Sequence, residues 1–395
     1  MNRPIPILAA KLVLIAVFFA FIFLPPVKTM VSPDTVWSSV EKRKLAELPE
    51  IHLSPQALSE LSKNFEAFYN DHFGFREQLI QRYNKYMQRY FGKTASRKVM
   101  IGKNGWLYLT EAQLIEDYLR LDPLTPEELE RWRLNLEAKQ RWLKERGIPY
   151  LFVIAPNKQS IYPEYMPDYL TQKPGQSRLD QLVDYLREKH SEVDVLDLRD
   201  SLLAAKQNRP VYYRTDTHWN HQGAYVAYRQ ILERMRQLYP RRRIPEAVFT
   251  ETPKRKKWRT DLARMAQLDD SLLENVSRLT VKSRCARKVP IELQGVDQNH
   301  SPPFRTQCDR ADLRAVMFRD SFATAVQPFL SESFKEIVYI FDQYNHAVMR
   351  QLLESGRPDV VIEEMVERYL ILIRPTAGLI PVDPLTDRPS SEPRG

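Results

Sequence analysis

Residues 313–322 read Leu313-Arg314-Ala315-Val316-Met317-Phe318-Arg319-Asp320-Ser321-Phe322. The first six residues are typical of a buried strand, and a helical pattern begins directly after the polar turn, at Phe322. Further apolar runs of strand length lie at 150–154, 193–198, 211–214, 336–341 and 359–362. Because helical patterns separate these runs, we expect an α/β fold in which a mostly parallel sheet is covered by helices.

The expected helices are identified by apolar spacing and by signals at their ends. One begins after Thr125, because Thr125-Pro126-Glu127-Glu128 supplies an N-cap, a proline at the first helical position and a capping-box glutamate. It ends at Gly147, a typical C-terminal cap. The other expected helices lie at 58–91, with a break near Gly74, and at 176–189, 223–238, 322–330, 346–353 and from about Glu364. Two short strands are expected within 99–109, around Lys103-Asn104-Gly105.

Composition limits the class of protein. The chain has 395 residues, and 59 Lys or Arg against 50 Asp or Glu give a net charge of +9. A hydrophobic content of 43% is enough for a sizeable core, so the chain as a whole is not disordered. Two cysteines cannot build a disulfide scaffold or a four-cysteine zinc site.

The N-terminus carries an almost unbroken apolar run, Ile5–Leu24, which only Lys11 interrupts. Twenty helical residues span about 30 Å, the thickness of the hydrocarbon core of a bilayer. Arg3 and Lys11 favour a cytoplasmic N-terminus by the positive-inside rule. A cleaved signal peptide and a buried soluble helix are the alternatives, but the small residues of a cleavage site are missing. We therefore expect a single-pass anchor with everything after residue 28 outside the cytoplasm.

That location determines the expected partners and the state of the cysteines. A basic surface outside the cytosol is expected to meet anionic polymers or lipid headgroups, and no nucleic-acid partner is expected. Cys285 and Cys308 can form a disulfide in an oxidising compartment, and two reduced thiols are the alternative. Closing this loop would contribute about 3 kcal/mol in the chain-entropy model.

The expected domain organisation has four parts. A transmembrane helix at 1–28 is followed by a helical region at 29–95. The α/β domain occupies 96–375 and contains a basic, poorly periodic insertion at about 240–310. The proline-rich tail, 376–395, is expected to be disordered.

Two polar segments follow expected strands, where ligands bind in open α/β sheets. Asp216 and His218 come directly after the run 211–214, and residues two apart in extended chain point the same way. A carboxylate beside a histidine can orient the imidazole as a general base. Ser321 would lie at a strand-to-helix turn, where amide groups can stabilise an oxyanion. The sequence therefore indicates a Ser–His–Asp site.

Each of these residues also has a plainer interpretation. A serine that opens a helix often serves only as its N-cap, and a histidine in a polar loop often makes only structural hydrogen bonds. Asp216, His218 and His221 together could instead ligate a metal, because carboxylate and imidazole are standard zinc ligands. The histidines elsewhere are scattered, so we expect no metal site.

The motifs resemble the SGNH-hydrolase-like alginate O-acetyltransferase family (AlgJ/AlgX-like). The resemblance rests on an ordered set of segments that covers most of the chain, roughly residues 65–370: Asp71-His72-Phe73-Gly74-Phe75-Arg76, Gly102-Lys103-Asn104-Gly105-Trp106-Leu107-Tyr108, Ala155-Pro156-Asn157-Lys158, Asp216-Thr217-His218-Trp219-Asn220 with Gly223, Arg319-Asp320-Ser321-Phe322, and Pro358-Asp359-Val360-Val361 with Glu364 and Glu367-Arg368. The nucleophile follows the Asp/His pair, so the resemblance is to a circularly permuted SGNH form.

The resemblance implies a periplasmic enzyme, anchored in the bacterial inner membrane, that transfers acetyl groups to hydroxyls of an exopolysaccharide. It implies Ser321 as nucleophile, His218 as base and Asp216 as the acid that orients it. It implies no cofactor, and an integral-membrane acyltransferase as the partner that supplies the acyl group. The alternatives are a polysaccharide O-acetylesterase and a non-catalytic polysaccharide-binding or assembly protein.

The residues that complete the oxyanion hole in ordinary SGNH enzymes are not assigned by motif. Arg319 replaces the glycine that usually lies two positions before the serine. Asn157 and Lys158, after another expected strand, are candidates for the oxyanion site or for substrate contact. Arg319 itself is a candidate of the same kind. Trp219 is a candidate sugar-stacking platform, and a buried packing role is the alternative.

Overall fold

The computed structural model of the chain describes residues 5–31, 36–38, 43–50, 55–94, 96–111, 113–258, 260–266, 268, 274–282, 285–298 and 300–373. The chain divides into two compact units, residues 1–100 with 261–272 and residues 101–260 with 273–395. The expected disordered tail, 376–395, lies outside the described residues. The expected domain boundaries at residues 28, 95 and 375 stay predictions.

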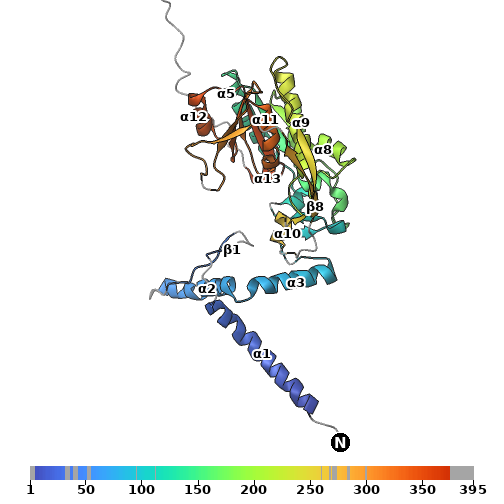
Figure 1. Ribbon diagram of the computed structural model, residues 1–395, viewed down its shortest axis with the longest axis vertical. Helices are drawn as coiled ribbons and strands as arrows, with labels where there is room; N and C mark the ends of the chain where they lie inside the picture. Colours follow the sequence, from blue (N-terminus) through green and yellow to red (C-terminus); the bar gives the residue numbers. More distant parts are fainter. Residues whose placement is uncertain are drawn as a thin grey trace, which may run out of the picture. The chain divides into compact units, whose positions relative to one another are not determined.

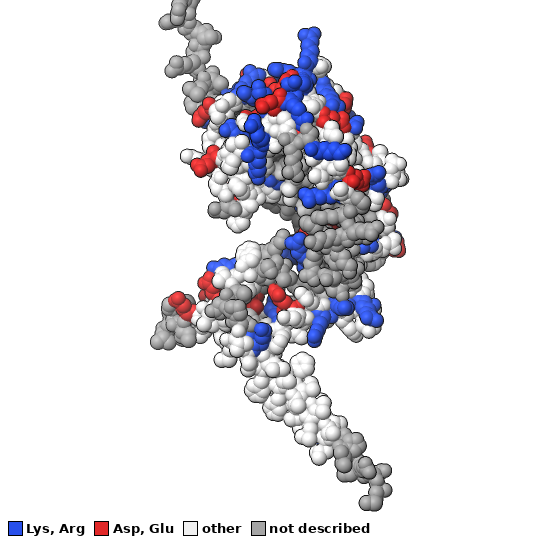
Figure 2. All heavy atoms as spheres, in the orientation of Figure 1, with Lys and Arg blue, Asp and Glu red and all other residues white. Residues whose placement is uncertain are grey.

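The first unit begins with α1 (Ile5–Val31), which continues through Pro25 and Pro26 beyond its expected end at residue 28. Leu8–Val31 is long and apolar enough to cross a membrane, judged by length and composition. Its large apolar side chains are exposed, and the helix presents an almost uncharged surface in Figure 2. This helix is therefore compatible with a single-pass anchor.

The expected helix at 58–91 is two helices, α2 (Pro55–His72) and α3 (Arg76–Phe91). They are separated at the expected place near Gly74, where Phe75 adopts a left-handed conformation with φ of 66°. The Asp71 carboxylate accepts a hydrogen bond from the Ala46 amide at 2.8 Å, and His72 Nε2 lies 3.0 Å from the Ala46 carbonyl. These two motif residues therefore organise the first unit. Its short strands β1 (Trp37–Ser38) and β2 (Arg43–Lys44) pair antiparallel.

The second unit is built on a seven-stranded sheet in the order β6-β5-β13-β11-β12-β10-β9. The first five strands in this order pair parallel, and β10 and β9 extend the sheet antiparallel. The strands are β5 (Tyr150–Ala155), β6 (Asp194–Asp197), β9 (Arg287–Pro290), β10 (Phe304–Gln307), β11 (Arg314–Phe318), β12 (Glu336–Ile340) and β13 (Val360–Val366).

Helices cover both faces of this sheet (Figure 1). One face packs on α5 (Pro126–Lys144), α7 (Arg178–Glu188) and α12 (His346–Ser355) through a continuous apolar core. On the other face lie α8 (Arg199–Lys206), α9 (His221–Leu238) and α11 (Gln327–Ser333), and the Ser331 hydroxyl of α11 bonds the Tyr339 hydroxyl of β12 at 3.0 Å. The expected α/β fold, a mostly parallel sheet covered by helices, is thus confirmed.

Smaller elements complete the two units. The expected strand pair within 99–109 is present as β3 (Val99–Ile101) and β4 (Leu107–Leu109) around the 3-10 turn η1 (Lys103–Gly105). The others are α4 (Leu114–Tyr118), α6 (Lys158–Ile161), η2 (Pro163–Tyr165), α10 (Asp261–Met265), η4 (Phe322–Ala325) and α13 (Tyr369–Leu372). Thr125 forms the expected capping box with Glu128 at the start of α5.

The stretch 240–310, expected as an insertion without regular order, contains four strands. β7 (Phe249–Trp258) and β8 (Glu274–Val281) form an antiparallel hairpin, and β9 and β10 join the main sheet. A disulfide links Cys285 to Cys308, with their Cα atoms 5.1 Å apart. These strands were not predicted, because their apolar residues are spaced irregularly in the sequence. Strands in hairpins or near the edge of a sheet bury few of their side chains, so they need no regular apolar pattern.

Residues 211–214 were expected to form a sheet strand, and this expectation is wrong. The segment makes only an isolated bridge between Tyr212 and Trp219. Val211 and Tyr212 are buried, which explains the apolar signal, but the Val211 backbone pairs outside the sheet: its amide donates to the Tyr162 hydroxyl at 2.9 Å. The Asn220 amide donates to the Val211 carbonyl at 2.9 Å.

Two helix expectations near the C-terminus also need correction. No helix begins near Glu364, because β13 continues to Val366 and the next helix begins at Tyr369. In the sequence, the acidic pair Glu363-Glu364 is typical of the first turn of a helix. In the structure, both residues belong to the strand β13 and their side chains are buried. The expected helix at 322–330 is instead a 3-10 turn, η4, followed by α11, with Pro328 in the first turn of α11.

Candidate active site

Ser321 lies where β11 ends and η4 begins. The Arg319 amide still pairs with the Ile340 carbonyl of β12 at 2.9 Å, and the chain turns away from the sheet directly afterwards. Ser321 occupies the N-cap position of η4 but makes no capping hydrogen bond with its side chain. Its hydroxyl oxygen instead lies 2.8 Å from His218 Nε2. The plain N-cap interpretation of Ser321 therefore does not describe its contacts.

His218 lies in a tight turn that the segment 211–220 makes between α8 and α9. The Tyr213 amide donates to the His218 carbonyl at 3.3 Å, which closes the turn. At the end of this turn, the Asn220 side chain caps α9: its oxygen accepts hydrogen bonds from the amides of Gln222 and Gly223. The start of α9 thus fixes the chain immediately after the histidine.

Asp216 completes the arrangement. Its Oδ1 lies 2.7 Å from His218 Nδ1 and accepts a second hydrogen bond from the His218 amide at 3.1 Å. A carboxylate at Nδ1 favours the tautomer in which Nδ1 carries the proton, so that Nε2 can accept the proton of the serine hydroxyl. The side chain of His218 is 28% exposed, which leaves the site open to a substrate. The structure thus brings Ser321, His218 and Asp216 together in one hydrogen-bonded chain.

The segment that carries Asp216 is anchored from both sides. Lys158 is buried, and its ammonium donates to the carbonyls of Leu107 at 2.6 Å and Arg214 at 3.0 Å. The Glu274 carboxylate of β8 accepts from the amides of Arg214 and Thr215. The contacts described for Lys158 therefore support the turn, and they do not direct its ammonium towards Ser321.

Aromatic packing supports the histidine. The Phe322 ring lies 4.8 Å from the His218 ring and 5.1 Å from the Trp219 ring, measured between centroids. Trp219 is only 1% exposed, and its indole N–H donates to the Phe322 carbonyl at 3.0 Å. Trp219 is thus inaccessible to a sugar in this structure and links the two halves of the site by packing.

Arg319 is also turned inward. Its guanidinium donates to the Asp320 carbonyl at 3.0 Å and to the Thr324 hydroxyl at 2.9 Å, and it lies over the Phe341 ring at 4.5 Å. Burial lowers the pKa of this guanidinium. The Arg319 side chain therefore holds the turn that carries the serine, through its bonds to Asp320 and Thr324.

Beneath the serine lies a pair of buried carboxyl groups, Asp320 and Glu364. The Asp320 carboxylate accepts from the amides of Phe322 and Val366, both at 2.7 Å, and so ties the serine turn to β13. The Asp320 amide donates to Glu364 Oε2 at 3.2 Å. Burial, followed by the charge of Asp320, raises the pKa of Glu364 well above its usual range, and burial also raises the pKa of Asp320.

Asn157 lies at the same edge of the sheet, directly after β5. Its amide donates to Glu367 Oε2 at 2.7 Å, while its own side chain makes no capping bond to α6. Ser160 also donates to Glu367, at 2.6 Å. Burial nevertheless raises the pKa of Glu367 to about 7, against the lowering effect of these two hydrogen bonds. Glu367 therefore fixes the loop that presents Asn157.

Of the three alternative metal ligands, Asp216 and His218 lie together. Within the described part of the chain, however, no group of His, Cys, Asp and Glu side chains with ligand atoms within 4.8 Å of one another contains His221 as well. His221 begins α9, beyond the capping residue Asn220. His218 already uses one ring nitrogen for Asp216 and the other for Ser321.

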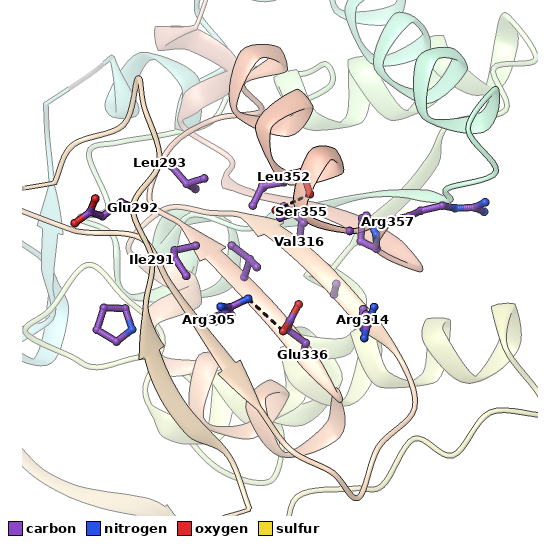
Figure 3. Close-up of a pocket in the computed structure, with 15 residues that line it drawn as sticks. Ile291, Glu292, Leu293, Arg305, Arg314, Val316, Glu336, Leu352, Ser355 and Arg357 are labelled. Atoms are coloured by element: carbon purple, nitrogen blue, oxygen red, sulfur yellow. Dashed lines mark hydrogen bonds and ion pairs between the residues drawn. The ribbon is translucent and has the colours of Figure 1, made fainter.

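A separate cavity of about 520 Å³ lies at the other end of the strands (Figure 3). It is lined by the first residues of β11 and β12, Arg314 and Glu336, whereas Ser321 follows the last residue of β11. Among the residues that line this cavity, Arg305 and Glu336 form an ion pair, with Arg305 Nη1 3.7 Å from Glu336 Oε2. This cavity is therefore distinct from the site around Ser321.

Sequence reasoning did not single out three residues that shape the site: Phe322, Asp320 and Arg368. Phe322 and Asp320 directly follow and precede the serine, but their contacts with His218 and β13 depend on the fold. Arg368 belongs to a segment of the family resemblance, which was the one available signal. Its guanidinium lies over the Phe322 ring at 5.5 Å.

Comparison with known proteins identifies relatives of this chain. Residues 99–295 match the family model described as "SGNH hydrolase-like domain, acetyltransferase AlgX". The matched segment contains Asn157, Asp216 and His218 and ends before Ser321. The resemblance to AlgJ/AlgX-like proteins is thereby confirmed, whereas the role of the serine rests on the geometry above.

Curated relatives are similar to parts of the chain. A probable alginate O-acetylase AlgJ of Pseudomonas aeruginosa is 33% identical over 127 residues, which cover 32% of this chain and 30% of that protein. A protein of the same name from Pseudomonas putida is 23% identical over 307 residues, or 69% of this chain and 70% of that protein. For the three first relatives, the match spans between 30% and 43% of their own length.

A similar solved structure is the O-acetyltransferase domain of Pseudomonas putida AlgJ. It aligns with a TM-score of 0.47 at 18% identity and covers 73% of this chain and 96% of that domain. The structure of Bacillus cereus PatB1 aligns with a TM-score of 0.48, also at 18% identity, over 69% of this chain and 96% of that one.

Proposed function

Because residues 99–295 carry the SGNH hydrolase-like domain of the AlgX acetyltransferase family, we propose that the chain is an extracytoplasmic O-acetyltransferase. It transfers acetyl groups to hydroxyls of an exopolysaccharide through an acetyl-serine intermediate. The observation that carries this proposal is the hydrogen-bonded chain from Ser321 through His218 to Asp216, with contacts of 2.8 and 2.7 Å. These distances are those expected of a nucleophile, its base and the group that orients the base.

In the first half-reaction, Ser321 attacks the carbonyl carbon of an acetyl ester. His218 Nε2 takes the hydroxyl proton as the bond from Oγ to the carbonyl carbon forms. The resulting imidazolium is stabilised by Asp216 and then gives the proton to the departing alcohol as the bond between donor oxygen and carbonyl carbon breaks. The products are acetyl-Ser321, neutral His218 and the deacetylated donor.

In the second half-reaction, a sugar hydroxyl replaces the donor alcohol. His218 removes its proton, and the sugar oxygen attacks the acetyl carbonyl. The bond to Ser321 Oγ breaks, and Oγ recovers a proton from His218. If water takes the place of the sugar, the same steps give an esterase, so the acceptor decides between the two activities.

The tetrahedral intermediates of both halves carry a negative charge on the carbonyl oxygen. We assign its stabilisation to the Ser321 amide and to the side chain of Asn157. Asn157 follows β5, which is separated from β11 by β13 alone. Its 3% exposure provides the dry surroundings in which a hydrogen bond to an oxyanion is strong.

The N-terminal helix supports the proposed location, and the proposed acetyl donor depends on that location. With α1 as a single-pass anchor in the inner membrane, the site faces the periplasm, where acetyl-CoA is absent. We propose that an integral-membrane acyltransferase delivers the acetyl group to this chain as an ester. The polysaccharide acceptor is then a cell-surface or exported polymer.

The test replaces Ser321 with alanine in a strain that has no other copy. The acetyl content of the exported polysaccharide should fall to background with Ser321→Ala and stay normal with Ser201→Ala, a matched change on α8. Unchanged acetylation in the Ser321 variant would refute the proposal. A purely binding role would leave Ser321 unlabelled by a sulfonyl fluoride, and the alanine variant would then acetylate normally.

A further inference from the structure

The junction between α2 and α3 lies against the end of α1, within the first unit. The Thr29 hydroxyl of α1 donates to the carbonyl of His72, the last residue of α2, at 2.8 Å. A Cβ at Gly74 would lie only 2.2 Å from the Pro25 carbonyl oxygen, so the two backbones approach closely there. The apolar run of α1 ends at Leu24, directly before Pro25. With this run in the hydrocarbon core of a bilayer, the junction lies at the level of the lipid headgroups.

α3 starts at this junction and carries a stripe of large apolar side chains. Four of them recur at intervals of four and three residues, so they share one face of the helix. They are Leu79, Tyr83, Tyr86 and Tyr90. Their exposed fractions lie between 43% and 65%, so the described part of the chain leaves this face largely uncovered. A continuous exposed apolar face marks a contact with another molecule or with a membrane.

A row of cations runs beside the stripe. Arg82, Lys85 and Arg89 are exposed and recur at intervals of three and four residues. The Arg89 guanidinium lies 5.9 Å from the centre of the Tyr90 ring, which shows that the row and the stripe are adjacent. The one acidic residue of α3, Glu77, is confined to its first turn. Beyond that turn, α3 therefore carries aromatic rings and cations but no carboxylate.

These properties fit the surface of a bilayer. The tyrosine ring has an apolar body and a polar hydroxyl, which suits the boundary between headgroups and acyl chains. Lys and Arg beside it attract anionic headgroups. A protein partner could also cover aromatic rings, but the contact with the end of α1 places the start of α3 at the headgroups before any partner binds.

We propose that α3 lies on the periplasmic surface of the membrane that α1 crosses, with the tyrosine stripe inserted between anionic lipid headgroups. An amphipathic helix of this kind binds reversibly by itself, so α1 remains the anchor and α3 adds a second contact. This inference rests on α1 as a membrane anchor and does not depend on acetyl transfer at Ser321.

The test locates α3 in the full-length chain after reconstitution into vesicles of phosphatidylcholine and phosphatidylglycerol. Because the native cysteines, Cys285 and Cys308, form a disulfide, one introduced cysteine carries a spin label. Electron paramagnetic resonance then measures the contact of this label with oxygen, which concentrates in lipid, and with a nickel chelate, which stays in water. The label at Tyr83→Cys should lie about 5–10 Å deep at the headgroup boundary. The label at Gln78→Cys, about 140° away around the helix, is the control and should remain in water.

A second measurement tests the role of the cations. Arg82→Gln combined with Arg89→Gln should raise the contact of the Tyr83 label with the nickel chelate at least about 2-fold, because each cation near an anionic membrane shifts binding about 5-fold. The same rise should follow when phosphatidylglycerol is omitted from the vesicles. Arg187→Gln combined with Lys189→Gln, at the end of α7, removes the same charge elsewhere and should change nothing. No effect of either change would overturn the role of anionic lipid.

Two results would overturn the inference while α1 still anchors the chain. In both, a reference label at Leu14→Cys, within the apolar run of α1, lies in lipid. Strong contact of the Tyr83 label with the nickel chelate would show that the stripe faces water. A Tyr83 label shielded from both the oxygen and the chelate would show that protein covers the stripe. A Leu14 label in water would refute the anchor and this inference together, whereas full acetyl transfer by Ser321→Ala would refute only the proposed function.

Discussion

Asp216 holds His218 by two hydrogen bonds, one to the ring and one to the amide. Asp216→Asn keeps the shape but offers an amide that can also donate, which favours the wrong tautomer of His218. We expect kcat for p-nitrophenyl acetate to fall about 10³- to 10⁴-fold with an unchanged fold. Steady-state kinetics and circular dichroism check this, with Asp184→Asn on α7 as control. A variant that keeps more than a tenth of the activity would contradict the role of Asp216.

Glu367 makes folding stability depend on pH. Burial raises its pKa in the folded chain to about 7, from 4.5 for the exposed group. The folded state therefore holds a proton that the unfolded chain releases above pH 4.5. The stability from this group is fully present below pH 4.5, is lost as pH rises through 7, and amounts to about 3 kcal/mol over that range.

The matching variant is Glu367→Gln, whose amide oxygen can still accept from Asn157 and Ser160. We expect the thermal midpoint of the native chain to fall more steeply between pH 5 and 7.5 than that of the variant. Thermal unfolding at several pH values measures the difference. Identical slopes would show that Glu367 titrates normally in the folded chain.

At the residue scale, the sequence indicated the three polar side chains of the site but not the roles of their neighbours. Aspartate, histidine and serine after apolar runs were enough to suggest the chemistry. The destinations of the Arg319 and Lys158 side chains could not be predicted, because long cations reach partners that only the tertiary structure supplies. Arg319 bonds its own turn, and Lys158 bonds the carbonyls of Leu107 and Arg214.

At the scale of elements, the turn 211–220 is pressed against the start of α9 at Gly223. A Cβ at Gly223 would lie 2.2 Å from the Val211 carbonyl oxygen and 2.8 Å from Trp219 Cβ. Gly223→Ala must therefore move helix α9 away from the turn 211–220. This turn carries Asp216 and His218, and the start of α9 holds it in place. We expect a loss of about 1–3 kcal/mol in stability and a larger relative loss of activity.

Denaturant unfolding and p-nitrophenyl acetate hydrolysis measure the two effects of Gly223→Ala. Gly295→Ala is a contrasting glycine variant, because a Cβ there meets no atom within 4 Å, although its positive φ of 79° adds local strain. We expect Gly295→Ala to retain full activity. Wild-type activity and stability in Gly223→Ala would contradict the close approach of these two elements.

The same elements show which parts of the fold could be predicted from the spacing of apolar residues and which could not. Long periodic helices and the buried parallel strands were predicted, because their burial repeats regularly along the chain. Residues 211–214 were mistaken for a strand, since burial of Val211 and Tyr212 does not require a partner strand. Glu364 was mistaken for a helix start, because a buried carboxyl pair with Asp320 leaves no trace in the sequence.

At the scale of the whole molecule, the proposed location rests on α1. Within its segment Leu8–Val31, a window of 18 residues has a mean hydropathy of 2.5, high enough to cross a bilayer. We expect the full chain to sediment with membranes and to resist extraction by high salt or carbonate. A chain without residues 1–31 should be soluble and should still hydrolyse p-nitrophenyl acetate. A full-length chain in the soluble fraction would contradict the anchor.

The overall class of the molecule could be predicted from its sequence, but its division into units could not. Alternating strands and helices predicted the α/β fold, and the apolar N-terminus predicted a helix that could cross a membrane. The segment 261–272, however, groups with residues 1–100 and not with its sequence neighbours. Such grouping depends on contacts between distant segments, which local patterns do not encode.

The central claim is that Ser321 is a nucleophile activated by His218. Mass spectrometry of the full-length chain after treatment with a sulfonyl fluoride tests it most directly, with the site of the adduct read from its peptides. The account predicts one adduct, on Ser321, which forms at least about 100-fold more slowly in His218→Ala because the serine then lacks its base. An adduct on another residue, or an equal rate in His218→Ala, would contradict it.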